Sequence, residues 1–388
     1  MLSLLRGGFA VLGLAAGIAL AAPAFASADE ITGHVYVNDN TTPRNTISGY
    51  DRHADGSLTP IPGSPFAAGG AGTGSGLASQ GAIQVSSDGR YVLAVDAGSN
   101  QISVLRIQRD GTLELVRGEP VSSNGSYPVS VAEHDGLVYV ANSGGPTGGP
   151  DSNYTGFVLG RHGQLEPLAG SAFPLPSGAQ PGDVLFNSDG RNLVGTRVGV
   201  TPADSAIDSF RVDRDGILDP APGSPFPAQG AGPFGSEFRP TNSNQLFVSN
   251  AHNGGSNLGT VSAFNVGDDG ALTSIASSPF PDDQNAPCWV EITHDGQFLF
   301  TVNTASGSIS SYRIARDGTL HLLGSTLVSG GKGASAVDAR LSTNGQTLYV
   351  NETKFGQIGE LAVDGGALTE IGSVPVSTGP GAAGVAVN

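Results

Sequence analysis

The sequence predicts an all-β fold, a seven-bladed β-propeller of four-stranded antiparallel sheets. Three observations predict it. A turn motif recurs seven times, short β-type runs are separated by glycine-containing turns, and the C-terminus carries a strand that the N-terminal unit lacks. A closed ring of such units buries a continuous core, because each blade packs against its two neighbours.

The repeat is marked by a glycine-containing turn that is followed by a leucine. Successive leucines are 48 to 55 residues apart, which is close to the length that a four-stranded blade needs. Seven units predict seven blades. The leucines are Leu58, Leu113, Leu165, Leu218, Leu272, Leu320 and Leu368.

Within one unit, runs of β-branched and aromatic residues predict the strands. Residues 81–86, 91–95 and 101–107 are expected to form the first three strands, with turns at Asp88-Gly89 and Asp110-Gly111. Aspartate followed by glycine suits tight hairpins, because these turns need positive φ angles.

The two ends of the chain predict how the ring closes. Residues 34–37 resemble the second strand of a unit and have no first strand before them, whereas residues 384–388 resemble a first strand and have no second strand after them. We expect these ends to pair and to complete one blade from one C-terminal and three N-terminal strands, which leaves no open edge.

Residues 1–28 are expected to be a signal peptide, because Arg6 precedes an apolar run and small residues follow it. Residues 29–388 are then one propeller domain, secreted or periplasmic. The apolar run is too short and too rich in glycine and alanine for a membrane span, so no membrane insertion is expected.

Composition excludes several classes of partner. The formal net charge of −16 argues against nucleic acid and anionic membranes. Cys288 is the single cysteine, so disulfides do not contribute to the fold. No zinc-binding motif and no serine-hydrolase elbow is present, and we expect neither a cofactor nor a metal. We also expect a monomer.

Longer motifs carry a family resemblance. They are DGRYVLAVDAGSNQISVLRI at residues 88–107, GSPF at residues 63–66 and 223–226, and PCWVEITHDGQFLFTVNT at residues 287–304. With these motifs the sequence resembles the β-propeller lactonases, which include propeller-type 6-phosphogluconolactonase and 3-carboxy-cis,cis-muconate lactonizing enzyme. The resemblance implies a channel site that contains arginine and acidic residues. Its characteristic histidine has no clear counterpart, because His134 and His294 fall at blade corners.

Charge gathers at the predicted channel positions of three adjacent blades. The first strand of each blade borders the channel, so alternation decides which side chains face it. Because Val290 and Ile292 suit packing positions, Trp289 and Glu291 are expected to face the channel.

The same alternation directs four more charged residues inward from the two neighbouring blades: Glu237, Arg239, Asp338 and Arg340. Glu291 is the candidate general base, and Arg340 or Arg239 is the candidate partner of the developing oxyanion. Alternatively, these charges only neutralise one another across neighbouring strands and hold the channel in shape.

Further substrate contacts are predicted for four residues, Glu237, Asp338, Arg197 and Trp289. Arg197 belongs to a column of polar residues near the ends of the second strands, for which turn hydrogen bonds are the simpler explanation. It is otherwise a candidate anion-binding residue at the channel mouth. The glycine-rich residues 67–79 are expected to form a flexible rim loop with too little apolar bulk to pack.

Two functions therefore remain open. The first is a metal-independent lactonase, or a lactone-forming enzyme, whose substrate is a small acidic lactone or carboxylate bound in the channel. The second is a non-catalytic propeller that binds a protein or glycan partner at the cell surface or in the periplasm.

Overall fold

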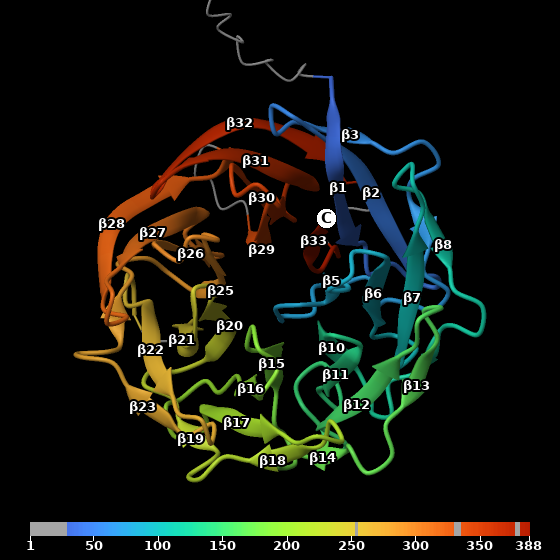
Figure 1. Ribbon diagram of the computed structural model, residues 1–388. Helices are drawn as coiled ribbons and strands as arrows, with labels where there is room; N and C mark the ends of the chain where they lie inside the picture. Colours follow the sequence, from blue (N-terminus) through green and yellow to red (C-terminus); the bar gives the residue numbers. More distant parts are fainter. Residues whose placement is uncertain (1–28, 253–254, 330–334, 377–380) are drawn as a thin grey trace, which may run out of the picture.

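The computed structural model describes residues 29–252, 255–329, 335–376 and 381–388. The signal-peptide expectation for residues 1–28 lies outside the described residues. Seven antiparallel sheets stand around a central axis, as the sequence predicts (Figure 1). Among the described residues there is no helix with the length and apolar character needed to cross a bilayer.

Each sheet runs from an innermost strand at the axis to an outermost strand at the rim. The innermost strands are β33 (Val385–Val387), β5 (Ile83–Val85), β10 (Pro128–His134), β15 (Pro181–Phe186), β20 (Pro233–Arg239), β25 (Pro287–Ile292) and β29 (Ala336–Leu341). The second strands are β1 (Ile31–Asn38), β6 (Tyr91–Asp96), β11 (Leu137–Asn142), β16 (Asn192–Arg197), β21 (Asn242–Asn250), β26 (Phe298–Asn303) and β30 (Thr347–Glu352).

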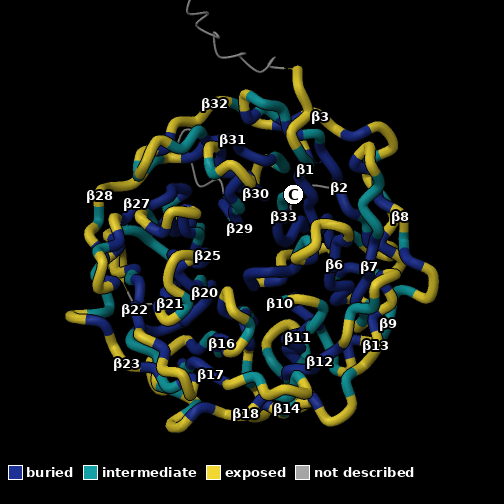
Figure 2. Tube along the Cα trace, viewed as in Figure 1, coloured by how far each residue is buried: buried dark blue, intermediate teal, exposed yellow. Residues whose placement is uncertain are grey.

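The outer half of each sheet is more exposed (Figure 2). The third strands are β2 (Thr46–His53), β7 (Gln101–Ile107), β12 (Asn153–Leu159), β17 (Ala206–Val212), β22 (Thr260–Val266), β27 (Ser308–Ile314) and β31 (Gln357–Asp364). The outermost strands are β3 (Leu58–Pro60), β8 (Leu113–Leu115), β13 (Leu165–Pro167), β18 (Leu218–Pro220), β23 (Leu272–Ser274), β28 (Leu320–Leu327) and β32 (Ala367–Pro375). In five sheets a short extra strand also pairs with the third: β4 (Phe66–Ala67), β9 (Val121–Ser122), β14 (Phe173–Pro174), β19 (Phe226–Pro227) and β24 (Phe280–Pro281).

The repeat leucines have one structural role. Six of them begin an outermost strand, Leu368 is the second residue of β32, and all seven are buried. Each outermost strand therefore buries one leucine side chain in the apolar core, which explains why leucine recurs at this position.

Tyrosines of four second strands, β1, β6, β11 and β30, tie their blades to the next blade. The hydroxyl of buried Tyr36 donates to the carbonyl oxygen of Gly111 at 2.9 Å, and Tyr139 donates to Gly216 at 2.8 Å. Tyr349 reaches across the closing junction to the carbonyl oxygen of Gly56 at 3.0 Å. Each ring fills the space between two sheets while its hydroxyl satisfies a turn carbonyl of the following blade.

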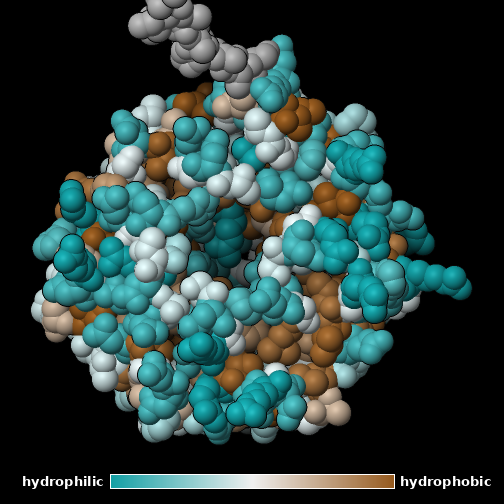
Figure 3. Space-filling model, in the orientation of Figure 1, coloured by the Kyte–Doolittle hydropathy of each residue, from teal (hydrophilic) through white to brown (hydrophobic). Residues whose placement is uncertain are grey.

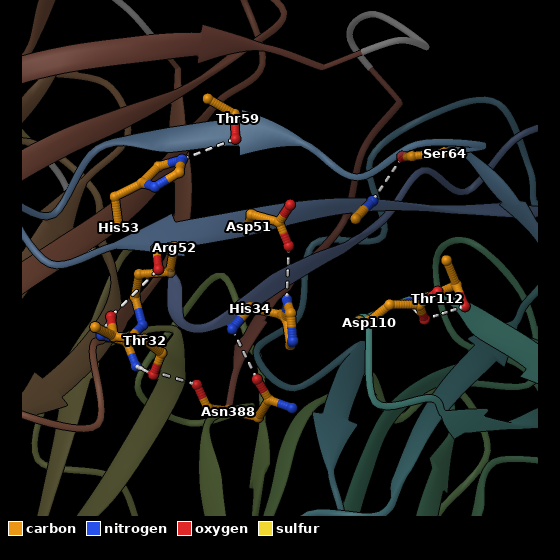
Figure 4. Close-up of polar contacts among 12 residues, drawn as sticks. Thr32, His34, Asp51, Arg52, His53, Thr59, Ser64, Asp110, Thr112 and Asn388 are labelled. Atoms are coloured by element: carbon orange, nitrogen blue, oxygen red, sulfur yellow. Dashed lines mark hydrogen bonds and ion pairs between the residues drawn. The ribbon is translucent and has the colours of Figure 1, made fainter. Parts of the chain in front are cut away.

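The ring closes through the chain ends, as the sequence predicts. β33 pairs with β1 in antiparallel register, with Val35 opposite Val387 and Val37 opposite Val385. Beyond the strand, the backbone nitrogen of His34 donates to Oδ1 of Asn388 at 2.8 Å (Figure 4). The backbone nitrogen of Asn388 donates in return to the carbonyl oxygen of His34 at 3.0 Å.

Candidate functional site

The chain segment around Gln80, which we call the crosspiece, lies between two cavities of the central channel. The backbone nitrogen of Gln80 donates to the carbonyl oxygen of Gly182 at 2.8 Å, and its Nε2 donates to that of Ser236 at 2.8 Å. Its Oε1 accepts from the backbone nitrogen of Val290 at 3.0 Å. The chain that precedes β5 thus reaches across the axis and is bonded to three other blades, β15, β20 and β25 (Figure 1).

The crosspiece depends on a glycine in β20. A Cβ atom at Gly235 would lie 2.1 Å from Oε1 of Gln80, so any side chain there would displace the amide. The expectation that residues 67–79 form only a flexible rim loop is wrong at its C-terminal end. Leu77 and Ser79 are buried, and the hydroxyl of Ser79 donates to the carbonyl oxygen of Val129 at 2.7 Å.

The first cavity, which we call the polar cavity, has a volume of about 330 Å³ and lies at the C-terminal ends of the innermost strands. Its polar side chains come from Gln84, Glu237, Glu291, His294 and Arg340. A hollow with hydrophilic residues at its floor is visible at the centre of the ring in Figure 3. Glu237, Glu291 and Arg340 are therefore brought together in one cavity.

Glu291 and Arg340 form an ion pair across neighbouring innermost strands. Nη1 of Arg340 donates to Oε2 of Glu291 at 2.9 Å, and the backbone nitrogen of Leu341 donates to Oε1 at 3.3 Å. Both side chains are largely buried, with 23% and 12% exposure for Arg340 and Glu291. Among the described residues, no other group accepts a hydrogen bond from this guanidinium, so its remaining N–H groups are available to a ligand.

Glu237 is the carboxyl group most strongly biased toward its neutral form in this cavity. Burial raises its pKa well above the ordinary value, and the negative charge of Glu291 raises it further, while Arg340 acts in the opposite direction. A neutral carboxyl group beside an ion pair gives one potential proton donor and one potential proton acceptor in the same cavity.

Asp338 supports the closure of the ring. Its Oδ2 accepts from the backbone nitrogen of Val385 at 3.0 Å, and its Oδ1 accepts from that of Ala339 at 2.9 Å. Its side chain is buried and does not line the polar cavity, so the predicted contact between Asp338 and a substrate is not supported. Burial raises its pKa to about 6, although the nearby Arg340 opposes the shift.

Asp183 is a further buried carboxylate that the site prediction omitted. Its Oδ2 accepts from the backbone nitrogen of Ser236 at 2.9 Å and from the hydroxyl at 2.6 Å. Burial raises its pKa to about 7. The hydroxyl of Ser130 in β10 donates to its Oδ1 at 3.4 Å, so Asp183 is held from two neighbouring blades and is part of the channel wall.

The prediction that Arg239 faces the channel is wrong. Its guanidinium donates to the carbonyl oxygen of Gly296 at 2.8 Å, to Oε1 of Gln245 at 2.8 Å and to the carbonyl oxygen of Ala315 at 2.9 Å. A register shift between Phe238 and Arg239 interrupts the alternation and turns this side chain toward the next blade.

Arg197 also lies outside both channel cavities. Its Nε donates to Oδ2 of Asp208 at 2.7 Å, and its Nη2 bonds to Oδ1 of the same carboxylate. The hydroxyl of Tyr154 completes this group by donating to Asp208 at 3.1 Å. Arg197 borders a separate surface pocket with Gln180, so its role as a channel anion-binding residue is not supported.

Two aromatic residues hold their predicted places in the fold but border different cavities. Trp289 does face the channel, but it lines the second cavity, across the crosspiece from Glu291. His294 lies at a blade corner, as predicted, and from the turn after β25 it also lines the polar cavity. The one sequence signal for His294 is its position two residues after β25, where a corner residue can still reach the axis.

Comparison with known proteins identifies the family. A family model described as "Lactonase, 7-bladed beta-propeller" matches residues 44–145 and 238–382, which is more than half of the chain. The chain belongs to this lactonase family. Glu291 and Arg340 lie within the second matched segment of the lactonase model, and Glu237 directly precedes it.

Solved structures show the same fold at low identity. The periplasmic gluconolactonase PpgL of Pseudomonas aeruginosa is 17% identical, with a TM-score of 0.67, over 90% of this chain and 98% of that chain. A proposed 6-phosphogluconolactonase of Bacteroides uniformis is 19% identical, with a TM-score of 0.71, over 92% and 99% of the two chains. A protein of Lactobacillus plantarum is 17% identical, with a TM-score of 0.71, over 92% and 100%. No curated protein sequence matches this lactonase-family chain at a significant level.

Proposed function

We propose that the chain hydrolyses, or forms, the lactone of a small molecule in the polar cavity. The observation that carries the proposal is the Glu291–Arg340 ion pair beside the neutral-biased carboxyl group of Glu237. Membership of the lactonase family and a fold shared with a protein named as a gluconolactonase support it.

The three side chains have complementary roles in this reaction. The Glu291 carboxylate takes a proton from a water molecule, whose oxygen attacks the lactone carbonyl carbon. Free N–H groups of Arg340 stabilise the negative charge that develops on the carbonyl oxygen. When the ring C–O bond breaks, the Glu237 carboxyl group gives its proton to the leaving ring oxygen. Base, acid and oxyanion partner are all side chains, so we propose a metal-independent reaction.

The charge of the cavity limits the substrate. Of the described residues that line it, Arg340 alone carries a guanidinium, and Glu291 already neutralises that charge. The placement of Arg239 and Arg197 elsewhere removes the second cation that a phosphorylated substrate would need. We therefore propose a small lactone that carries at most one carboxylate.

We also propose that the protein acts outside the cytoplasm, on the basis of its N-terminal sequence. Amino-terminal sequencing of protein recovered from the periplasm or the medium should find a start near residue 29. Recovery of the chain only from the cytoplasm, with Met1 intact, would contradict export.

A lactone panel tests the catalytic proposal. The panel should include neutral and monocarboxylate lactones of five- and six-membered rings, assayed with the wild type, Glu291→Gln and Glu166→Gln. We expect saturable hydrolysis by the wild type that persists in EDTA and falls about 10²- to 10⁴-fold in Glu291→Gln, because the general base is lost. Glu166→Gln makes the same change on the exposed strand β13 and should keep wild-type activity.

Two outcomes would overturn the proposal. One is equal activity of Glu291→Gln and the wild type. The other is hydrolysis no faster than buffer for every lactone, which would favour the non-catalytic binding propeller.

A further inference from the structure

The second cavity, which we call the apolar cavity, lies on the other side of the Gln80 crosspiece. It has a volume of about 330 Å³ and is found at the N-terminal ends of the innermost strands. Its apolar lining includes Leu77, Phe234, Trp289 and Val337. This position separates it from the polar cavity, which lies at the opposite ends of the same strands.

Trp289 forms a fixed wall of the apolar cavity. Its Nε1 donates to the carbonyl oxygen of Ser79 at 2.9 Å, so its one polar atom is satisfied inside the protein. Phe234 packs edge-on against it, with ring centroids 5.1 Å apart and planes at 67°. The indole therefore presents apolar surface in a defined orientation to whatever enters the cavity.

The polar groups at the edge of this cavity leave little for a charged ligand. The described lining contains no aspartate, glutamate, lysine or arginine. The hydroxyl of Thr304 donates to the carbonyl oxygen of Ala336 at 3.0 Å, and that of Thr353 donates to Ser335 at 2.9 Å. Apart from the imidazole of His252, whose Nδ1 lies 3.4 Å from the carbonyl oxygen of Gly199, a charge buried here would find no counter-ion, which costs several kcal/mol or more.

Volume sets the size of the occupant. An apolar cavity of about 150 Å³ is enough to hold benzene. The apolar cavity is roughly twice that size and combines concave apolar walls with a few polar groups, as small-molecule sites do. We propose that it binds a neutral, largely apolar molecule of one or two rings, at a site distinct from the polar cavity.

The single tryptophan of the chain reports on this site directly. We would titrate the protein with iodobenzene, a neutral contact quencher, and follow Trp289 fluorescence. Saturable quenching by iodobenzene is expected. Iodide, a charged quencher, should have little effect, because Trp289 is only 5% exposed and its cavity disfavours charge.

A substitution at Gly76 tests the location. Gly76 lines the apolar cavity, and a Cβ atom there would meet nothing within 4 Å. Gly76→Phe should therefore be tolerated and should weaken iodobenzene binding at least tenfold by occupying the cavity. Glu166→Phe adds the same ring on exposed β13 and should bind as the wild type does. Glu291→Gln should also bind normally, which separates this proposal from the catalytic one.

Three results would overturn the inference. They are quenching of the wild type that rises linearly without saturation, equal affinity in the wild type and Gly76→Phe, or iodine density in an iodobenzene-soaked crystal only at places remote from Trp289. Iodine density beside the indole would support it independently of fluorescence.

Discussion

Removal of residues 384–388 should lower the free energy of unfolding by about 5 kcal/mol or more. The deletion exposes β1, abolishes its pairing with β33 and removes the fully buried Val385 side chain, which by itself contributes about 2 kcal/mol. It also leaves Asp338 without the N–H of Val385. Urea unfolding followed by circular dichroism measures the loss, and size-exclusion chromatography should show association through the freed edge of β1.

Removal of Asn388 alone is the matched control for this deletion. It eliminates the two hydrogen bonds with His34 and the longer one from Nη2 of Arg52 at 3.4 Å, but keeps the strand pairing, so we expect a loss of only about 1–2 kcal/mol. If the two truncations unfolded at the same urea concentration as the wild type, β33 would not be closing the ring in solution.

Arg340→Met should be the most damaging point substitution in the channel. The guanidinium is the cation that faces the carboxyl groups of Glu237, Glu291 and Asp338. Its removal leaves buried carboxylates without compensation, which typically costs about 3–5 kcal/mol. Lactone hydrolysis should be lost as well, because the oxyanion partner is absent. Urea unfolding at pH 5 and pH 8 and the lactone assay measure the two effects.

The sign of the pH dependence of stability follows from the raised pKa values of the buried carboxyl groups. The pKa of Asp338 is about 6 and that of Glu237 is raised, so the folded state binds more protons than the unfolded chain above about pH 4. Their contribution to stability is complete at lower pH and is lost as the pH rises through the folded pKa values. Arg340 lowers both pKa values, so Arg340→Met should raise them and should cost more stability at pH 8 than at pH 5.

Two variants serve as controls for Arg340→Met. Arg211→Met breaks an exposed pair with Asp219 and should leave stability nearly unchanged. The double variant Glu291→Gln/Arg340→Met removes both partners and should recover part of the loss at pH 8. An equal cost of Arg340→Met at both pH values would show that the carboxyl groups are not coupled to this guanidinium.

The sequence by itself determined the number of blades, the place where the ring closes and which side chains of β25 face the channel. The recurring leucines and Asp-Gly turns are local signals, and a side-chain period of two assigns faces wherever a strand is regular. For that reason Trp289 and Glu291 face the channel as predicted, and the two termini pair as predicted.

Only the tertiary structure decided which channel residues share a cavity. A register shift at the end of β20, between Phe238 and Arg239, turned Arg239 away from the axis, because irregular pairing breaks the alternation of facing. Gln80 separates Trp289 from Glu291 through bonds to three blades that lie 102 to 210 residues away along the chain. Such placements depend on long-range packing that no local pattern encodes, and they put a polar and an apolar cavity at opposite ends of one channel.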